Sequence, residues 1–444
     1  MHVFPQLRKL EEKYAGELAV VGVHSAKFNA EKATDNVRRA ILRYEIEHPV
    51  INDADFMVWQ QYACRAWPTL MFISPTGKVI GKHEGEFPIE ALDNVLATMI
   101  GEFDEDGEMD RKPLAFRLES EMEWERPLSF PGKIHASEHG LFISDSNHNR
   151  IVWSGLDGEI RAIIGNGKRG LKDGSAPEAS FHDPQGTDLD WPYLYVADTK
   201  NHAIRMIDLE NLEVRTLAGV GEQAVGRHAG GNGRFVSLAS PWDVVKVASA
   251  LYIAMAGFHQ LWKLDLNNRD LRPHAGNGRE RIIDGPLQHA ELAQPSGIVS
   301  DGETLYFADS ETSSIRSAAV SPMGSVNTLV GEGLFTFGDA DGIGDDVRLQ
   351  HPIGLDLYDG MLWITDSYNN KIKSLDPTSR LCRSVFGSGD VGDADGIEAQ
   401  AEFYEPGGIS VHDGKLYIAD TNNHAVRVAD LESKEVTTLQ IRGD

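Results

Sequence analysis

The sequence predicts two domains of different fold class, an α/β domain over residues 1–100 and an all-β propeller of six blades over residues 127–444. The propeller is predicted because one strand-turn-strand pattern returns six times, at intervals of about 53 to 57 residues. Alternating apolar and polar residues fill each interval, as expected of half-buried strands. Before residue 100, helical and strand-like runs alternate instead, and this alternation predicts the α/β domain.

Each repeat begins at a proline that opens the expected innermost strand of a blade: Pro131, Pro184, Pro241, Pro295, Pro352 and Pro406. The next strand ends in an aspartate in five copies, at Asp145, Asp198, Asp309, Asp366 and Asp420. The third copy has Met255, Ala256 and Gly257 where the others have Asp followed by Ser or Thr. Between repeats an apolar residue recurs after an Asp-Gly turn, and we expect it to seal the interface between two blades: Phe181, Leu292, Leu349 and Phe403.

The Pro-x-Gly start, the LYxAD strand and the N-H-x-I/V-R turn together resemble the NHL repeat, and the resemblance covers about 315 of the 444 residues. It implies a propeller fold and leaves the chemistry open, since such propellers serve as RNA binders, protein docking platforms, sensors and occasionally enzymes. The pairs Asn201-His202 and Asn423-His424 are readable as metal ligands or bases. We expect them instead to cap tight turns by bonding backbone amides.

Charge and cysteine content restrict the class of protein. The formal net charge of −26 disfavours a nucleic-acid partner, because binding of phosphates depends on Lys and Arg. No run approaches the roughly 20 apolar residues of a membrane span, and the first residues lack the features of a signal peptide. The two cysteines, Cys64 and Cys382, fall in different predicted domains and fit a reducing compartment. We therefore expect a cytoplasmic protein without a membrane partner.

In the first domain we expect four helices. The first ends at Gly16, and the others cover about residues 30–45, 55–62 and 88–99. A buried strand from Leu18, a short strand near residue 50 and a hairpin turning at residues 75–77 separate them. Residues 101–126 begin with an acidic run that is poor in large aliphatic side chains, so they are expected to form a linker.

Trp67, Pro68 and Thr69 precede a strand and a P-x-G hairpin, and the segment around them resembles the thioredoxin-like fold, specifically the TlpA-like thioredoxins. The resemblance implies that the Trp67–Pro68 bond is cis and that these three residues form a surface that binds extended peptide. Cys64 is expected to be a buried packing residue.

The sequence departs from that family in one respect, because no C-x-x-C motif is present. The combined architecture looks like the family of NHL repeat-containing protein two and its bacterial relatives, in which a segment similar to residues 1–5 follows the second cysteine. The resemblance thus implies that the first strand and both thiols are absent. A start codon assigned too late and a true variant without redox chemistry both explain this.

The leading hypothesis is a thiol-disulfide oxidoreductase-like protein whose propeller binds the client or partner, redox-inactive in this chain because a lone Cys64 has no resolving thiol. The alternative is a non-catalytic scaffold for protein interaction that uses a propeller face, with Phe258, His259 and Trp262 as candidates. Whether the protein is an enzyme stays open, as does its oligomeric state. We expect a protein or peptide client.

Two patterns are readable as metal sites, although we expect neither a metal nor a cofactor. The acidic pairs Asp339/Asp341 and Asp393/Asp395 could hold calcium, but Asp-Gly is also an ordinary turn signal. A propeller hydrolase or lyase would need side chains of the innermost strands to converge on a metal in the channel. The candidates for this are His135, Asp188, Asp243, Asp356 and His412.

Overall fold

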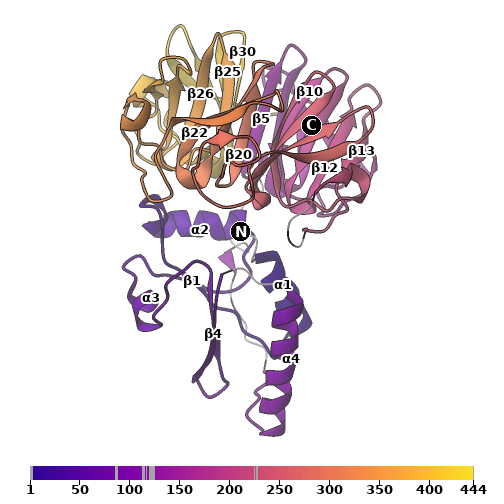
Figure 1. Ribbon diagram of the computed structural model, residues 1–444, viewed down its shortest axis with the longest axis vertical. Helices are drawn as coiled ribbons and strands as arrows, with labels where there is room; N and C mark the ends of the chain where they lie inside the picture. Colours follow the sequence, from indigo (N-terminus) through magenta and orange to yellow (C-terminus); the bar gives the residue numbers. More distant parts are fainter. Residues whose placement is uncertain are drawn as a thin grey trace. The chain divides into compact units, whose positions relative to one another are not determined.

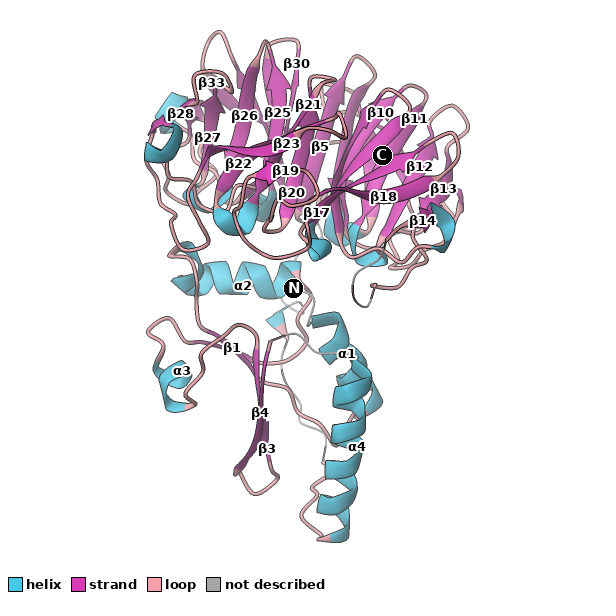
Figure 2. Cartoon of the chain, in the orientation of Figure 1, coloured by secondary structure: helices cyan, strands magenta, loops and turns pink. Residues whose placement is uncertain are grey.

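The computed structural model describes residues 4–85, 89–112, 116, 118–119, 126–224, 226 and 229–443. The chain divides into two compact units, Met1–Glu125 and Arg126–Asp444. Figures 1 and 2 show helices mainly in the first unit and strands in the second. None of the described helices is long and apolar enough to cross a membrane.

The first unit contains two separate two-stranded sheets. Strands β1 (Gly22–His24) and β2 (Val50–Asn52) pair in parallel, and β3 (Thr69–Ile73) and β4 (Val79–Glu84) form an antiparallel hairpin. The helices are α1 (Phe4–Lys13), the 3₁₀ turn η1 (Ala30–Lys32), α2 (Thr34–Arg43), α3 (Met57–Gln61) and α4 (Ile89–Glu105). Their small core is formed where Leu10 of α1 and Leu92 and Leu96 of α4 meet, with Leu70 of β3 packed against them.

Three elements of this unit differ from the prediction. The strand expected from Leu18 is only three residues long, because β1 pairs with β2 alone and β2 has only three residues to offer. The helix expected over 30–45 is broken at Ala33, whose backbone is extended (ψ 130°). Helix α4 continues to Glu105, so the acidic segment expected to be linker begins as helix.

The second unit is a six-bladed β-propeller. Each blade is an antiparallel sheet whose strands follow one another outward. The innermost strands are β5 (Pro131–Ser137), β10 (Pro184–Asp190), β15 (Pro241–Val247), β20 (Pro295–Ser300), β25 (Gly354–Tyr358) and β30 (Pro406–His412). The second strands are β6 (Gly140–Asp145), β11 (Tyr193–Asp198), β16 (Ala250–Met255), β21 (Thr304–Asp309), β26 (Met361–Asp366) and β31 (Lys415–Asp420).

The third strands are β7 (Arg150–Ser154), β12 (Ala203–Asp208), β17 (Gln260–Asp265), β22 (Ser314–Ala319), β27 (Lys371–Leu375) and β32 (Ala425–Asp430). The fourth strands are β8 (Ile160–Ile164), β13 (Glu213–Ala218), β18 (Asp270–Ala275), β23 (Ser325–Val330), β28 (Leu381–Phe386) and β33 (Glu435–Leu439). Blades two to six add a short outermost strand: β9 (Gly174–Ser175), β14 (Gly231–Asn232), β19 (Gly285–Pro286), β24 (Gly342–Ile343) and β29 (Gly396–Ile397).

The 3₁₀ turns occupy two recurring places. One follows every second strand: η3 (Ser146–His148), η4 (Thr199–Asn201), η6 (Ala256–Phe258), η7 (Ser310–Thr312), η9 (Ser367–Asn369) and η11 (Thr421–Asn423). The other follows the outermost strand in blades three, five and six: η5 (Gly233–Phe235), η8 (Gly344–Asp346) and η10 (Glu398–Gln400).

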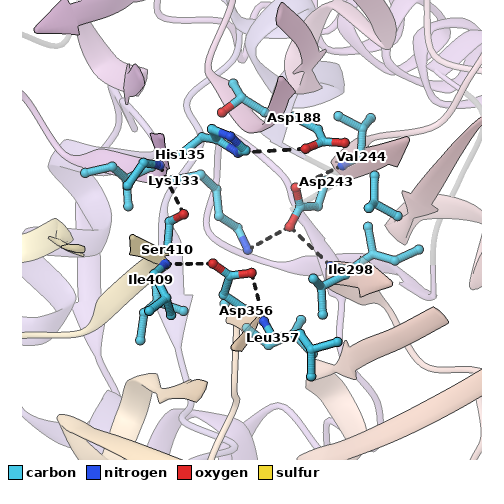
Figure 3. Close-up of a pocket in the computed structure, with 18 residues that line it drawn as sticks. Lys133, His135, Asp188, Asp243, Val244, Ile298, Asp356, Leu357, Ile409 and Ser410 are labelled. Carbon is cyan, nitrogen blue, oxygen red and sulfur yellow. Dashed lines mark hydrogen bonds and ion pairs between the residues drawn. The ribbon is translucent and has the colours of Figure 1, made fainter. Parts of the chain in front are cut away.

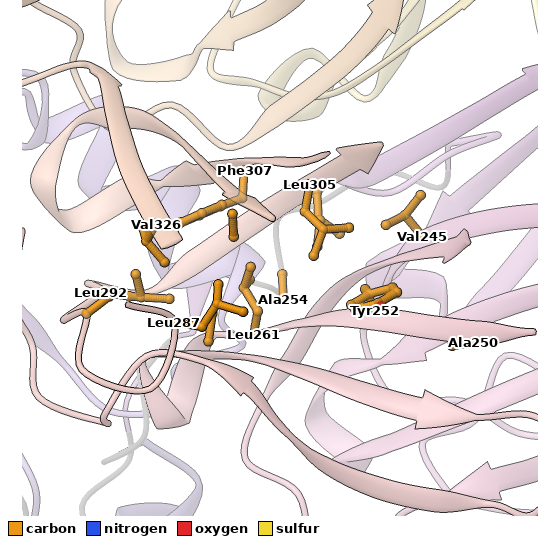
Figure 4. Packing of buried hydrophobic residues seen from close by; sticks show 14 residues of the cluster. Val245, Ala250, Tyr252, Ala254, Leu261, Leu287, Leu292, Leu305, Phe307 and Val326 are labelled. Carbon is orange, nitrogen blue, oxygen red and sulfur yellow. The ribbon is translucent and has the colours of Figure 1, made fainter. Parts of the chain in front are cut away.

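Apolar side chains fill the space between neighbouring blades. Between blades three and four, Tyr252 and Leu261 face Leu305 and Phe307, and Leu292 of the connecting segment completes the cluster (Figure 4). Leu292 and its counterparts Phe181, Leu349 and Phe403 are fully buried, which confirms that the recurring apolar residue seals the four interfaces where the pattern occurs. Each such interface removes large apolar side chains from water, which is the main stabilising contribution to a fold of this kind.

A buried ion pair recurs beside these clusters. In blade two, Arg205 Nη1 donates to Asp198 Oδ2 at 2.8 Å, and Nη2 donates to Asp173 Oδ1 of the connecting segment at 3.0 Å. Arg316 in blade four and Arg427 in blade six make the same two contacts, and Lys373 replaces the arginine in blade five. The cation thus ties the connecting segment to the second and third strands of its blade.

Blade three lacks all three members of this arrangement. Met255 stands in place of the buried aspartate, Trp262 in place of the arginine and Gly230 in place of the outer aspartate. Met255 and Trp262 are fully buried in one apolar cluster. A Cβ atom at Gly230 would lie 2.1 Å from the carbonyl oxygen of Leu271, so no side chain fits there. In blade three, apolar packing therefore replaces the buried ion pair of the other blades.

We predict that Arg316→Met destabilises the propeller by about 3–5 kcal/mol, because it leaves Asp309 buried without its cation. The double variant Asp309→Met with Arg316→Met should be more stable than the single one, since it copies the apolar character of blade three. Urea denaturation followed by far-ultraviolet circular dichroism measures both. Arg272→Met is the control, because its ion pair with Asp270 is exposed and worth less than about 1 kcal/mol. Equal losses for Arg316→Met and the control would contradict the prediction.

Candidate binding surfaces

Trp67, Pro68 and Thr69 lie together at the start of β3. The Trp67–Pro68 bond is cis, as expected from the sequence. The Trp67 ring is 49% exposed and packs against Trp59, with 4.5 Å between ring centroids. Its indole nitrogen donates to the carbonyl oxygen of Ser25 at 2.9 Å. The result is a fixed, partly exposed aromatic surface beside the hairpin.

A buried carboxylate positions this surface. Asp53 accepts hydrogen bonds from the backbone N–H groups of Val58 and Trp59, each at 2.9 Å, and from the hydroxyl of Ser25 at 2.8 Å. Burial opposes ionisation of Asp53, but these donors outweigh it and lower the pKa of the carboxyl. The ionised side chain therefore joins the start of α3, which carries Trp59, to the segment that holds Trp67.

The two cysteines lie in different units. Cys64 is half-buried rather than fully buried as expected. Cys382 is buried in blade five, and this burial raises the pKa of its thiol to about 12. Burial therefore disfavours a reactive thiolate at Cys382.

The aromatic cluster expected on blade three is not exposed. Trp262 is fully buried, and its indole nitrogen donates to Gln260 Oε1 at 3.0 Å. Phe258 stacks on the Trp262 ring with centroids 5.3 Å apart and is half-buried. His259 Nδ1 accepts a hydrogen bond from the backbone N–H of Gln294 in the next blade at 3.2 Å. These three residues therefore pack the blade and join it to its neighbour.

The histidines of the Asn-His pairs have the same joining role. Nδ1 of His202 accepts from the N–H of Ser240 at 3.0 Å, and Nδ1 of His424 accepts from the N–H of Phe130 at 3.2 Å. The asparagine before each of them donates to the buried aspartate of its own blade. The expectation that these pairs cap their own turns is therefore wrong, because the histidines bond amides of the neighbouring blade and the asparagines donate to a carboxylate.

The acidic pairs are also engaged by protein groups. Asp339 and Asp341 bind the ammonium group of Lys373, and Asp395 binds Arg427. Across the part of the chain that the structure describes, no three His, Cys, Asp or Glu side chains are placed to hold one metal ion.

A partly exposed aromatic patch lies on blades one and two, where His139 and Trp191 occupy the turns after the innermost strands and Trp153 and Arg161 lie in β7 and β8. The rings of His139 and Trp191 stack with centroids 3.9 Å apart, and Trp153 meets Trp191 edge-on at 6.2 Å. The guanidinium of Arg161 lies over the Trp153 ring and donates to the carbonyl oxygen of His139 at 2.7 Å. Trp191 is nevertheless 42% exposed. Sequence reasoning missed this patch, although a Trp-Pro pair in a hairpin turn is a visible signal.

Inside the propeller, the innermost strands place two layers of side chains along the central channel. The layer two residues after each opening proline has glycine in four blades, Lys133 in blade one and Asp243 in blade three. A Cβ atom at Gly186 would lie 1.8 Å from Asp243 Oδ1, and one at Gly297 would lie 3.3 Å from Lys133 Nζ. The channel is thus too narrow here for more side chains.

Lys133 and Asp243 close the channel at this layer. Lys133 Nζ lies 3.4 Å from Asp243 Oδ2 and donates to the carbonyl oxygen of Ile353, in blade five, at 2.7 Å. Burial lowers the pKa of Lys133 and raises that of Asp243, and the attraction between the two charges opposes both shifts. The pair therefore joins three blades across the axis.

The layer four residues after each proline lines a cavity of about 230 Å³ (Figure 3). Its members are His135, Asp188, Val245, Val299, Asp356 and Ser410. Asp188 accepts from the N–H of Lys246 in the next blade at 2.6 Å, and Asp356 likewise accepts from the N–H of Val411 at 2.7 Å. The two carboxylates therefore join adjacent blades. His135 Nδ1 lies 3.8 Å from Asp188 Oδ1, whereas His412 at the end of β30 does not line the cavity.

We predict a pH dependence of stability from Asp188. Burial raises the pKa of this carboxyl to about 6, so the folded protein keeps a proton that the unfolded chain has already released. The stabilisation is fully present below the ordinary pKa of 3.8 and is lost as the pH rises through 6. Asp188→Asn should remove about 2 kcal/mol of the change in unfolding free energy between pH 4.5 and 7. Urea denaturation at both pH values tests this, with Asp190→Asn as the control. Equal pH dependence in wild type and Asp188→Asn would refute it.

Comparison with known proteins agrees with this architecture. The NHL repeat family matches residues 403–429. Protein SUPPRESSOR OF QUENCHING 1, chloroplastic, of Arabidopsis thaliana is 44% identical, over 100% of this chain and 44% of that protein. NHL repeat-containing protein 2 is 39% identical in Bos taurus and 38% in Homo sapiens, in both cases over 99% of this chain and 66% of that protein.

The chain thus spans less than two thirds of the length of these relatives. Among solved structures, streptogramin B lyase aligns with a TM-score of 0.44 and 12% identity, over 72% of this chain and 86% of that chain. The chain therefore contains an NHL repeat within a six-bladed β-propeller, and it is homologous over nearly its whole length to part of the NHL repeat-containing protein 2 sequences.

Proposed function

We propose that the chain is a polypeptide-binding protein whose propeller docks a protein partner. The observation that carries this proposal is the patch of His139, Trp153, Arg161 and Trp191, because aromatic and arginine side chains dominate the energetics of protein interfaces. Propellers of the NHL type commonly mediate protein interactions, which is compatible with this assignment.

The chemistry of the patch defines the kind of partner that fits it. The stacked rings of His139 and Trp191 present a rigid apolar surface, and Arg161 brings a positive charge to its edge. An apolar side chain flanked by a carboxylate on a protein partner complements this surface.

We predict that Trp191→Ala lowers the affinity for the partner at least tenfold. Truncation of a tryptophan that is a binding hot spot costs about 2 kcal/mol or more of binding free energy. Affinity capture from the native cells, followed by calorimetry with the purified partner, measures the loss. Phe335→Ala is the control, because Phe335 is another large aromatic side chain that is exposed, on the segment that leads into blade five. If every partner binds Trp191→Ala as tightly as wild type, the patch is not the docking site.

For the first unit we propose a thioredoxin-like domain that holds extended polypeptide beside Trp67. Two features support it besides the sequence resemblance. The surface of Trp67 is fixed by Trp59 and Ser25 yet half exposed. The two small sheets also leave apolar strand residues open to solvent, with Val23 of β1 43% and Ile73 of β3 50% exposed. The apolar run Ala19–Val23 is typical of a strand buried inside a sheet. One further strand, paired with the exposed strands, would cover these apolar residues in both sheets.

The chain itself is expected to lack dithiol-disulfide exchange, because its two cysteines belong to different units and form no C-x-x-C motif. In an insulin-reduction assay with dithiothreitol, the rate with this protein should equal the uncatalysed rate. Cys64→Ser serves as the control and should change nothing. A rate above background that Cys64→Ser abolishes would contradict the expectation.

The intact mass of the protein from its native cells decides between the two explanations for the absent motif. A mass several kilodaltons above that of the 444 residues would support a longer oxidoreductase, and an equal mass would support a polypeptide-binding scaffold without redox chemistry.

A further inference from the structure

The central cavity has unbalanced negative charge. Of the described residues that line it, Lys133 is the only one with a permanent positive charge, and Asp243 pairs with it. Among the described residues that line the cavity, no lysine or arginine forms an ion pair with Asp188 or Asp356, and Lys246, whose charge acts on Asp188 from outside the lining, pairs with Asp190. Burial raises the pKa of both carboxyls, and burial lowers the pKa of His135, so the imidazole contributes no compensating charge near pH 7. Desolvation opposes the ionisation of both carboxylates, and the charge of Asp190 also opposes that of Asp188, so a cation bound between them would favour the ionised forms.

The two carboxylates come from opposite sides of the ring. Asp188 belongs to β10 of blade two and Asp356 to β25 of blade five, which are three blades apart in a ring of six. Each uses its two oxygens to accept one backbone N–H apiece, from its own strand and from the next blade. A carboxylate has about four acceptor positions, so each can still accept from a ligand.

The size and the walls of the cavity restrict the ligand further. A cavity of about 150 Å³ accommodates benzene, so the 230 Å³ here suits a molecule of roughly six to nine non-hydrogen atoms. Between the two carboxylates the wall includes the apolar side chains of Val245 and Val299. A bare metal ion would not fill this space, and no set of three ligating side chains is present among the described residues.

We propose that the channel cavity binds a short linear diammonium ion, with one ammonium group at Asp188, the other at Asp356 and the carbon chain against Val245 and Val299. The layer below provides an internal precedent. There the protein's own Lys133 extends an alkyl chain across the axis and places its ammonium group against Asp243 and a backbone carbonyl. A diammonium ligand would neutralise the upper layer in the same way and would join blades two and five.

The test uses 1,4-diaminobutane with the full chain, monitored by calorimetry and by the ¹⁵N-¹H resonances of Lys246 and Val411, which donate to the two carboxylates. Binding should shift both resonances. Affinity should fall at least tenfold for butylamine and for each of Asp188→Asn and Asp356→Asn, because one ammonium-carboxylate contact is then lost. Binding should also weaken as the pH falls through 6, where Asp188 takes up a proton.

Two controls keep the outcome clear. Asp190→Asn removes a carboxylate on the same strand that pairs with Lys246 outside the cavity lining, and it should leave affinity unchanged. Val299→Met narrows the cavity without altering charge, and it should weaken binding while the melting temperature shows that the variant is folded. Equal affinity for 1,4-diaminobutane and butylamine, or affinity unaffected by Asp188→Asn and Asp356→Asn, would overturn the proposal.

Discussion

The propeller depends on one hydrogen bond that crosses every boundary between blades. The donor is the backbone N–H of the residue before each opening proline, and the acceptor is a side chain at the end of the preceding blade's 3₁₀ turn. The acceptors are Asn149, His202, His259, Ser313, Asn370 and His424, at distances of 2.9 to 3.2 Å. The innermost strands of adjacent blades do not pair with each other, so these buried N–H groups have no strand partner and need a side chain instead.

This constraint explains an otherwise costly backbone geometry. Every one of the six acceptor residues has a positive φ, between 48° and 56°, and none is glycine. The left-handed conformation costs a non-glycine residue about 1 kcal/mol or more, and Asn is among the few residues that adopt it readily. Glycine would avoid the cost but would supply no acceptor. The last of the six bonds joins His424 of blade six to Phe130 of blade one and so closes the ring with the same contact that joins its other members.

Positions at which one blade differs from the repeat change the packing or the channel without changing the ring. Blade three replaces a buried ionic network by apolar residues and stays within the same geometry, which shows that the ion pairs are one of two ways to fill that space. In the channel, the replacement of glycine by Lys133 and Asp243 closes one layer, and the layer next to it keeps a cavity. The two small sheets of the first unit, by contrast, lie outside any such ring and leave apolar strand residues exposed.

The sequence by itself determined the number of blades, the order of their strands and the buried apolar residue between them, because each rests on local chemistry that repeats, whereas the cis bond at Pro68 followed from a family resemblance. It could not place Trp262, since an aromatic residue in an aberrant copy has the same local pattern whether it faces solvent or the next blade. It also missed the stacking of His139 on Trp191, which lie in turns of different blades. Which side chains line the cavity was decided by the convergence of six strands that are far apart in the chain, and that is a property of the closed ring alone.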